Sequence, residues 1–274
     1  MFNLLKLYNK NFSIYYIMKK LIFFRNMLGQ KNKCLFKNVE KELKISSLML
    51  QNNLKKDLFL LYDYNNNAEK CLNIGGDHSL SIATLSSSIH KHGNDIKVLW
   101  FDAHPDINSY EKSTTKNVHG MVLNYITQIG NNKDYTFDFI PKTPLPPSNI
   151  LYIGIRDIDS YEKEVIDKYN ISVISSQDVN EQPNNVANKI NDFIGDSNFH
   201  LSLDIDGLDP TYTPSTGTPV DNGMHLTPLL NVLENINHDN RINTDIVEYN
   251  PCIGNIYDKD KTLQNLKKII NVLK

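Results

Sequence analysis

The feature that most constrains the fold is a regular alternation of short apolar runs and longer amphipathic stretches. Strand-like runs lie at residues 20–24, 72–74, 97–101, 150–155, 171–175, 200–205 and 245–249. Helix-like stretches lie at 36–47, 48–62, 79–92, 118–129, 160–169, 182–195, 226–237 and 260–273. Strands that alternate with helices favour a mostly parallel sheet that is covered by helices on both faces. The pattern therefore predicts the α/β class, with a single three-layer α/β/α domain.

The domain is expected to span residues 18–274, because no Pro/Gly/Ser-rich linker or internal repeat interrupts the chain. Residues 131–149 contain four prolines and are predicted to form a surface loop. Residues 1–39 contain Lys and Arg but no Asp or Glu. We expect residues 1–17 to form either a disordered arm or a targeting segment.

Composition excludes several classes of function. The formal net charge of −2 gives no electrostatic reason to expect a nucleic-acid partner. No apolar stretch approaches the length of a membrane span, so we expect no membrane association. The three cysteines are scattered without metal-ligand spacing, and we expect free thiols in a reducing compartment. The predicted location is the cytoplasm, with the mitochondrion as the alternative.

Two acidic segments carry the strongest chemical signal. Asp102-Ala103-His104-Pro105-Asp106 and Asp204-Ile205-Asp206-Gly207-Leu208-Asp209-Pro210 each follow a buried-looking strand. Side chains at alternate positions of a strand point the same way, and two such strand ends would bring four Asp and one His together. That much negative charge requires cations, so the segments predict a metal site with two ions. Asp-rich strand ends also cap helices or start turns, but that role explains one Asp rather than two alternating sets.

A third segment, Gly75-Gly76-Asp77-His78-Ser79, follows a short apolar run and adds a candidate ligand, His78. In this order the three segments resemble the metal-binding signatures of the ureohydrolases, a superfamily that includes arginases, agmatinases, guanidinobutyrases and formimidoylglutamases. The resemblance implies an arginase-like fold and two Mn²⁺ ions. By resemblance, His78, Asp102, Asp106 and Asp204 hold one ion, and His104, Asp102, Asp204 and Asp206 hold the other. Oxygen-rich ligation without Cys suits manganese, with iron and cobalt as open alternatives.

The resemblance also implies an activity, the hydrolysis of the guanidinium group of L-arginine to L-ornithine and urea. Two metal ions can lower the pKa of a shared water and so supply hydroxide at neutral pH. The family's catalytic roles fall on Asp106 and His119 for proton transfer and on Glu248 for binding the guanidinium group. The substrate-binding positions carried over are Asn108, Thr115, Asn117, Asp159, Glu162, Thr218 and Glu248. The resemblance further implies a homo-oligomer, either a trimer or a hexamer.

Alternatives remain open at this point. The nearest one is an agmatinase or another guanidino-acid hydrolase of the same superfamily. A catalytically inactive binding protein on the same fold would have lost a metal ligand, and a single-metal deacetylase-like relative would lack the second His–Asp set, whereas all six positions are filled here. One departure concerns the substrate loop, because Thr115-Lys116-Asn117 stands where arginases usually carry Ser-Gly-Asn. Lys116 is expected either to bind the substrate carboxylate or to point to solvent.

Overall fold

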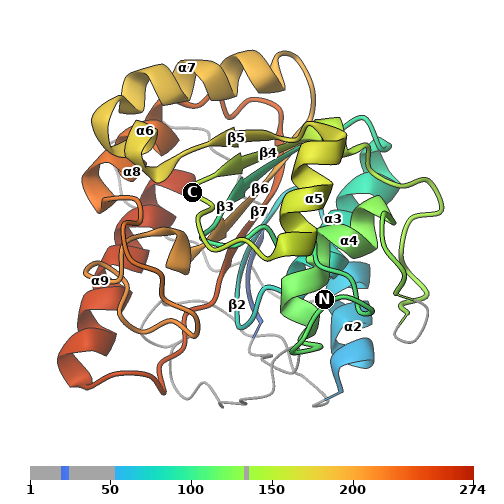
Figure 1. The fold of residues 1–274 in the computed structure, drawn as a ribbon, viewed down its shortest axis with the longest axis horizontal. Coiled ribbons are helices and arrows are strands. Elements are labelled where there is room, and N and C mark those ends of the chain that lie inside the picture. Colours follow the sequence, from blue (N-terminus) through green and yellow to red (C-terminus); the bar gives the residue numbers. More distant parts are fainter. Residues whose placement is uncertain (1–19, 25–52, 133–135) are drawn as a thin grey trace, which may run out of the picture.

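The strands form one sheet in which all neighbouring pairs run parallel (Figure 1). This computed structural model describes residues 20–24, 53–132 and 136–274. Within them the strand order is β1-β2-β7-β6-β3-β4-β5. The strands are β1 Lys20–Phe24, β2 Cys71–Gly75, β3 Lys97–Phe101, β4 Ile150–Ile153, β5 Ser172–Ile174, β6 Phe199–Asp204 and β7 Arg241–Val247. The predicted α/β class with a parallel sheet is confirmed.

Helices cover both faces of this sheet and make the outer two of three layers (Figure 1). One face packs against α2 Leu54–Asn66, α3 Leu80–His92, α4 Val122–Thr127 and α5 Ser160–Tyr169. The other packs against α6 Ser176–Glu181, α7 Pro183–Ile194, α8 Leu226–Asn235 and α9 Ile256–Leu273. Strand side chains alternate between the two cores, so Val98 and Trp100 face the first while Leu99 and Phe101 face the second.

Several predicted boundaries differ from those in the structure. The stretch 118–129 divides into a 3-10 turn at Val118–Met121 and helix α4. The sequence pattern does not predict helix α6, because this helix has only 6 residues; the Ser175 side chain caps it. Helix α9 begins earlier than predicted because the side chain of Asn255 accepts hydrogen bonds from the backbone N–H groups of Tyr257 and Asp258.

Some expectations fall on residues outside the described ranges, namely the arm at 1–17 and the helix at 36–47. The described part of the 131–149 loop contains no α-helix or strand, and it includes a 3-10 turn at Pro147–Asn149. No helix in the described ranges is both long and apolar enough to cross a bilayer. Cys71 is buried and forms no disulfide, whereas Cys252 is disulfide-bonded, so the expectation of free thiols is wrong for Cys252.

Candidate metal centre and substrate pocket

The acidic segments meet because their strands are neighbours in the sheet. Strands β3 and β6 pair in parallel with Phe101 opposite Leu203. The next residue on each strand is an aspartate, so Asp102 and Asp204 emerge side by side at the carboxyl edge of the sheet. Ligand sites of open parallel sheets form at this edge. The strand order, rather than proximity along the chain, therefore assembles the acidic cluster.

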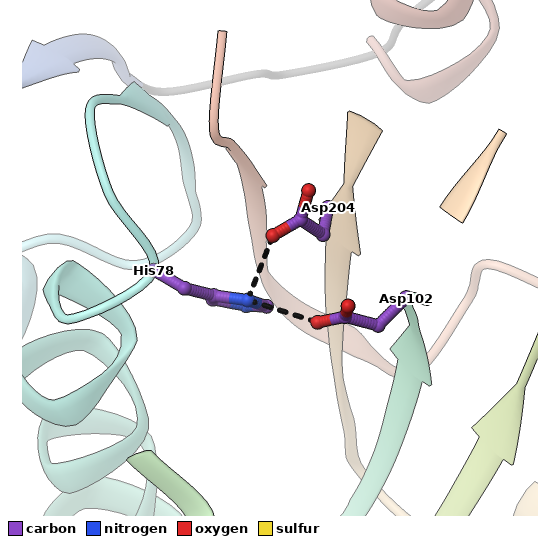
Figure 2. Close-up of side chains that lie close together, drawn as sticks. All are labelled: His78, Asp102 and Asp204. Carbon is purple, nitrogen blue, oxygen red and sulfur yellow. Dashed lines mark ion pairs between the residues drawn. The ribbon is translucent and has the colours of Figure 1, made fainter. Parts of the chain in front are cut away.

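His78 completes the first group of potential ligands (Figure 2). Its Nδ1 atom lies 3.1 Å from Asp102 Oδ2, 3.1 Å from Asp106 Oδ2 and 3.2 Å from Asp204 Oδ2. The ring stacks on the indole of Trp100 with a centroid separation of 4.0 Å. Its other nitrogen, Nε2, is 2.8 Å from the Ser202 hydroxyl oxygen. Packing and this hydrogen bond aim Nδ1 at three carboxylates.

His104 organises a second group together with Asp102 and Asp206. The His104 Nδ1 atom lies 3.2 Å from Asp206 Oδ2 and 3.5 Å from Asp102 Oδ1. The backbone N–H of His104 donates to Asp102 Oδ1 at 2.7 Å, and the hydroxyl of Thr218 donates to Asp206 Oδ2 at 2.8 Å. The two groups share Asp102, which is the arrangement expected of a carboxylate that bridges two ions.

The chemistry of these donors fits divalent cations. His78 Nδ1 and Asp102 Oδ2 are buried and, among the described residues, have no hydrogen-bond partner. Burial and then the neighbouring carboxylates Asp206 and Asp102 raise the pKa of Asp204 well above its usual value. Burial lowers the pKa of His104, but Asp102 and Asp206 outweigh it and raise that pKa to about 12. Crowded acids with unpartnered atoms are what a bound cation would neutralise. Oxygen and imidazole donors without thiolates suit a hard or borderline metal.

Two acidic residues of the site have left-handed backbone conformations. Asp106 has φ +48° and Glu248 has φ +66°, values that residues other than glycine adopt rarely. The predicted strand 245–249 ends at Val247 because the backbone turns at Glu248. The Glu248 N–H then donates to the carbonyl of Gly76 at 2.7 Å. Strained conformations of this kind collect at functional sites, where the surrounding fold holds them in place.

Glu248 lies below the cluster and contacts two histidines. Its Oε1 accepts a hydrogen bond from the backbone N–H of His78 at 2.9 Å and lies 3.2 Å from His119 Nδ1. Burial lowers the pKa of His119, but Glu248 and then Asp106 raise it to about 9. Burial and the neighbouring Asp102 raise the pKa of Asp106 to about 6. The base of the site thus combines a carboxylate with a histidine that stays protonated at neutral pH.

A pocket of about 230 Å³ opens over this cluster. It is lined by His104, Asp106, Asn108, Ser113, Thr115, Asn117, His119, Gly120, Asp157, Asp159, Glu162, Asp204, Asp206 and Thr218. Three residues proposed from the sequence, His78, Asp102 and Glu248, are buried and do not line it. Sequence reasoning included Ser113 only as part of the 113–117 loop that matches the carboxylate-reading positions, and it missed Gly120 and Asp157. Asp157 stands two residues before Asp159 at the same strand end, and this spacing was a usable signal.

The predicted substrate residues at the pocket wall also fix the loop that carries them. Asn108 Nδ2 donates to Asp159 Oδ2 at 2.8 Å, and the Ile107 N–H donates to Glu162 Oε1 at 3.1 Å. The other oxygen of Glu162 accepts from the Asp159 N–H at 3.1 Å, at the start of α5. Burial and then Asp106 raise the pKa of Glu162 to about 8. One side of the pocket is therefore built from the loop after β3 and the first turn of α5.

Lys116 does not reach this pocket. Its ammonium group donates to the backbone carbonyls of Tyr110 and Glu111 and lies over the Tyr110 ring. Lys116 has φ +58°, which explains why a glycine would suit this position. Of the two sequence expectations, contact with the substrate carboxylate has no support in this geometry. The side chain is exposed, and its ammonium group turns back onto its own loop.

Comparison with known proteins places the chain in a family. Residues 44–271 match the model of the arginase family. The chain is 35% identical over 202 residues to an arginase of Coccidioides immitis, covering 70% of this chain and 63% of that protein. It is 34% identical over 241 residues to an arginase of Plasmodium falciparum, covering 84% and 56% respectively. The chain thus spans less than two thirds of the length of these curated relatives.

A solved structure gives the same result. Entamoeba histolytica arginase, in complex with L-ornithine, matches with a TM-score of 0.79 and 26% identity. The match covers 92% of this chain and 98% of that chain. A Bacillus subtilis arginase shares the fold with a TM-score of 0.78. From the family model, the curated relatives and this shared fold, the chain belongs to the arginase family.

Proposed function

We propose that the protein hydrolyses the guanidinium group of L-arginine to L-ornithine and urea, using two Mn²⁺ ions. The observation that carries this proposal is the pair of ligand groups that share Asp102 at the floor of a polar pocket. Membership of the arginase family and curated relatives that are named arginases support it. The bound cations would supply a water of lowered pKa as the nucleophile. His78, Asp106 and Asp204 would hold one ion and His104 and Asp206 the other, with Asp102 and Asp204 shared.

Glu248, His119 and Asp106 would bind the guanidinium group and transfer the protons of the reaction. A guanidinium is planar and binds carboxylates through two hydrogen bonds, which suits Glu248 at the base of the site. His119 lines the pocket and remains protonated at neutral pH because its pKa is raised to about 9. It would give its proton to the departing amine, which leaves poorly without one. Asp106 would move the proton released by the attacking water.

The pocket wall would recognise the amino-acid end of the substrate. Asp159 and Glu162 supply acidic groups for the α-amino group, while Asn108, Thr115 and Asn117 supply polar groups for the α-carboxylate. Thr218 would keep Asp206 oriented through its hydroxyl. Agmatine lacks the α-carboxylate and would leave its polar partners unpaired. The proposal therefore favours arginine over agmatine as the substrate.

An assay of urea and ornithine tests this function directly. Metal-free protein would be loaded with Mn²⁺ and given L-arginine, agmatine and guanidinobutyrate in parallel. We expect the highest kcat/KM for arginine, and we expect Asp159→Asn to reduce that preference. If agmatine were turned over as well as arginine, the substrate assignment would be wrong and the agmatinase alternative would replace it.

Assembly and location remain predictions. We propose a homo-oligomer, either a trimer or a hexamer, which sedimentation of the purified protein would test. We also propose a cytoplasmic location, with the mitochondrion as the alternative.

A further inference from the structure

A chain of buried polar side chains lies beneath the candidate metal centre and takes no part in the chemistry proposed above. Its central residue is Asp245 on β7, which is fully buried. Asp245 Oδ2 accepts hydrogen bonds from Ser81 Oγ at 2.7 Å, Thr84 Oγ1 at 2.6 Å and His200 Nε2 at 2.9 Å. Its Oδ1 accepts one from Asn73 Nδ2 at 2.8 Å. Four donors around one carboxylate are the surroundings of a charged, permanently accepting group.

These contacts fix the direction of the hydrogen bonds that follow. Burial raises the pKa of Asp245, but His200 and the hydroxyl donors outweigh it and lower that pKa. An ionised carboxylate only accepts, so Ser81 must give its single hydroxyl proton to Asp245. Ser81 Oγ also lies 3.3 Å from Ser202 Oγ. Because the Ser81 proton is already used, Ser202 must be the donor in that contact.

The same reasoning extends to His78. With its proton directed to Ser81, Ser202 can only accept at its 2.8 Å contact with His78 Nε2. The imidazole must therefore carry a proton on Nε2. In the neutral ring this leaves the lone pair on Nδ1, the atom that faces Asp102, Asp106 and Asp204. The opposite arrangement would place the two serine oxygens 3.3 Å apart with no proton between them.

We propose that Ser81 and Asp245 are positioning residues that hold His78, through Ser202, in the tautomer that can bind a metal ion. This rests on the metal centre of the proposed function, but not on the identity of the substrate. An outer hydrogen bond to a histidine ligand sets its ring orientation and tautomer, and losing one commonly weakens metal affinity about 10- to 100-fold. Here the outer contact of His78 is the Ser202 hydroxyl. The direction in which this hydroxyl donates is set by the Asp245 carboxylate, which acts through Ser81.

The structure provides a matched control for Ser81. Thr84 lies on the same face of α3, is equally buried and donates to the same oxygen of Asp245. No contact joins Thr84 to Ser202 among the hydrogen bonds of the described residues. Ser81→Ala and Thr84→Val therefore each remove one donor from Asp245, but only Ser81→Ala breaks the link to His78. Comparing them separates tautomer control from a general loss of packing around Asp245.

The test is a titration of metal-free protein with Mn²⁺, in which free Mn²⁺ is followed by electron paramagnetic resonance. We expect Ser81→Ala to weaken one of two binding steps about tenfold, and Thr84→Val to leave both steps within about twofold of wild type. Thermal unfolding of the metal-free proteins should show similar losses of Tm for the two variants. Ser202→Ala should weaken the same binding step as Ser81→Ala.

A double variant completes the experiment. If Ser81 acts through Ser202, adding Ser81→Ala to Ser202→Ala should cause no further loss of affinity, a strongly non-additive result. Equal weakening by Ser81→Ala and Thr84→Val, additive losses, or unchanged affinity in Ser81→Ala would each overturn the proposal. Because Mn²⁺ binding is read without substrate, a failure of arginine hydrolysis alone would contradict the proposed function and leave this result standing.

Discussion

Single residues decide how the acidic cluster divides into two groups of potential metal ligands. Asp102 belongs to both ligand groups, and one of its oxygens faces His78 while the other faces His104. The backbone of the same segment supports it, since the His104 N–H donates to Asp102 Oδ1. Among the described residues, no other residue belongs to both ligand groups. Asp102 is therefore a position at which one substitution reaches both ligand groups.

Asp102→Asn keeps the shape of the side chain but removes its charge. We expect it to weaken Mn²⁺ binding by more than about 100-fold, because outer-contact losses already reach that size. Elemental analysis after dialysis should find less than one ion per chain in the variant and about two in wild type. Asp157→Asn is the control, since Asp157 is largely exposed and its Oδ2 lies 3.6 Å from His104 Nε2, outside both groups. Full metal content in Asp102→Asn would contradict the shared-ligand assignment.

Lys116→Gly tests whether Lys116, which stands where arginases usually carry glycine, affects substrate binding. The ammonium of Lys116 contacts loop carbonyls and not the pocket, while glycine tolerates the positive φ at this position. We expect KM for arginine to change less than about threefold, the scale of an exposed ionic contact. Asn117→Ala, which alters a pocket wall residue, should raise KM more. A rise for Lys116→Gly that exceeds the rise for Asn117→Ala would make Lys116 a substrate contact.

At the scale of elements, the sequence predicts local structure better than assembly. The strands that precede Asp102 and Asp204 could be predicted because buried parallel strands are continuous apolar runs in the sequence. The pattern did not reveal α6, which is too short for helical periodicity to show, or the end of β7 at Val247, which depends on the left-handed conformation of Glu248. Nor does it contain the strand order, in which β7 lies between β2 and β6.

The same limit explains which site residues the sequence revealed. Asp and His in alternating patterns are visible in a single segment, so the ligand candidates could be named. The Ser81–Ser202–His78 chain joins three elements through hydroxyl groups that have no distinctive spacing. Only the packing of α3 against β6 and β7 brings these serines together.

The loop between α8 and β7 contains a histidine held in its neutral form. His238 Nε2–H donates to the Leu233 carbonyl at 2.7 Å, and its Nδ1 accepts from Arg241 Nη1 at 3.1 Å. Arg241 also donates to the carbonyl of Leu273 at 2.6 Å, near the end of α9. Burial and then Arg241 lower the pKa of His238 to about 4. Protonation of Nδ1 would remove the acceptor that Arg241 uses.

This pair predicts a loss of stability in acid. A histidine in an unfolded chain titrates near pH 6.5. Because the pKa of His238 is lower than this in the folded protein, folding favours the neutral form of the ring. The stability that neutral His238 contributes is fully present above about pH 6.5 and is lost as pH falls toward about 4. Replacing His238 with Gln removes the titration, so Tm should fall less between pH 7 and pH 5 than in wild type. His225→Gln, at an exposed histidine, should keep the wild-type fall, and an unchanged fall in His238→Gln would refute the assignment.

At the scale of the whole molecule, the candidate metal centre joins segments that are far apart in the chain. His78 follows β2, Asp102 follows β3, Asp204 ends β6 and Glu248 follows β7. These four strand ends belong to one sheet, so the ligand cluster exists only when the sheet is assembled. Metal binding and folding are therefore linked, because an unfolded chain offers no such site.

Removal of metal should accordingly lower the stability of the entire fold. An ion present at 100 times its Kd stabilises a protein by about 2.7 kcal/mol, and each kcal/mol moves Tm by roughly 2–4 °C in chains of 150–250 residues. We expect Mn²⁺ to raise the Tm of metal-free protein by at least about 5 °C in scanning calorimetry, and chelation to reverse the gain. The gain should shrink below about pH 6, because burial and Asp102 raise the pKa of Asp106 to about 6 and protons then compete with the ion. Asp102→Asn should lose most of the gain while Asp157→Asn keeps it. If Mn²⁺ left the Tm of the wild-type protein unchanged, the clustered aspartates and histidines would bind no metal in the folded state.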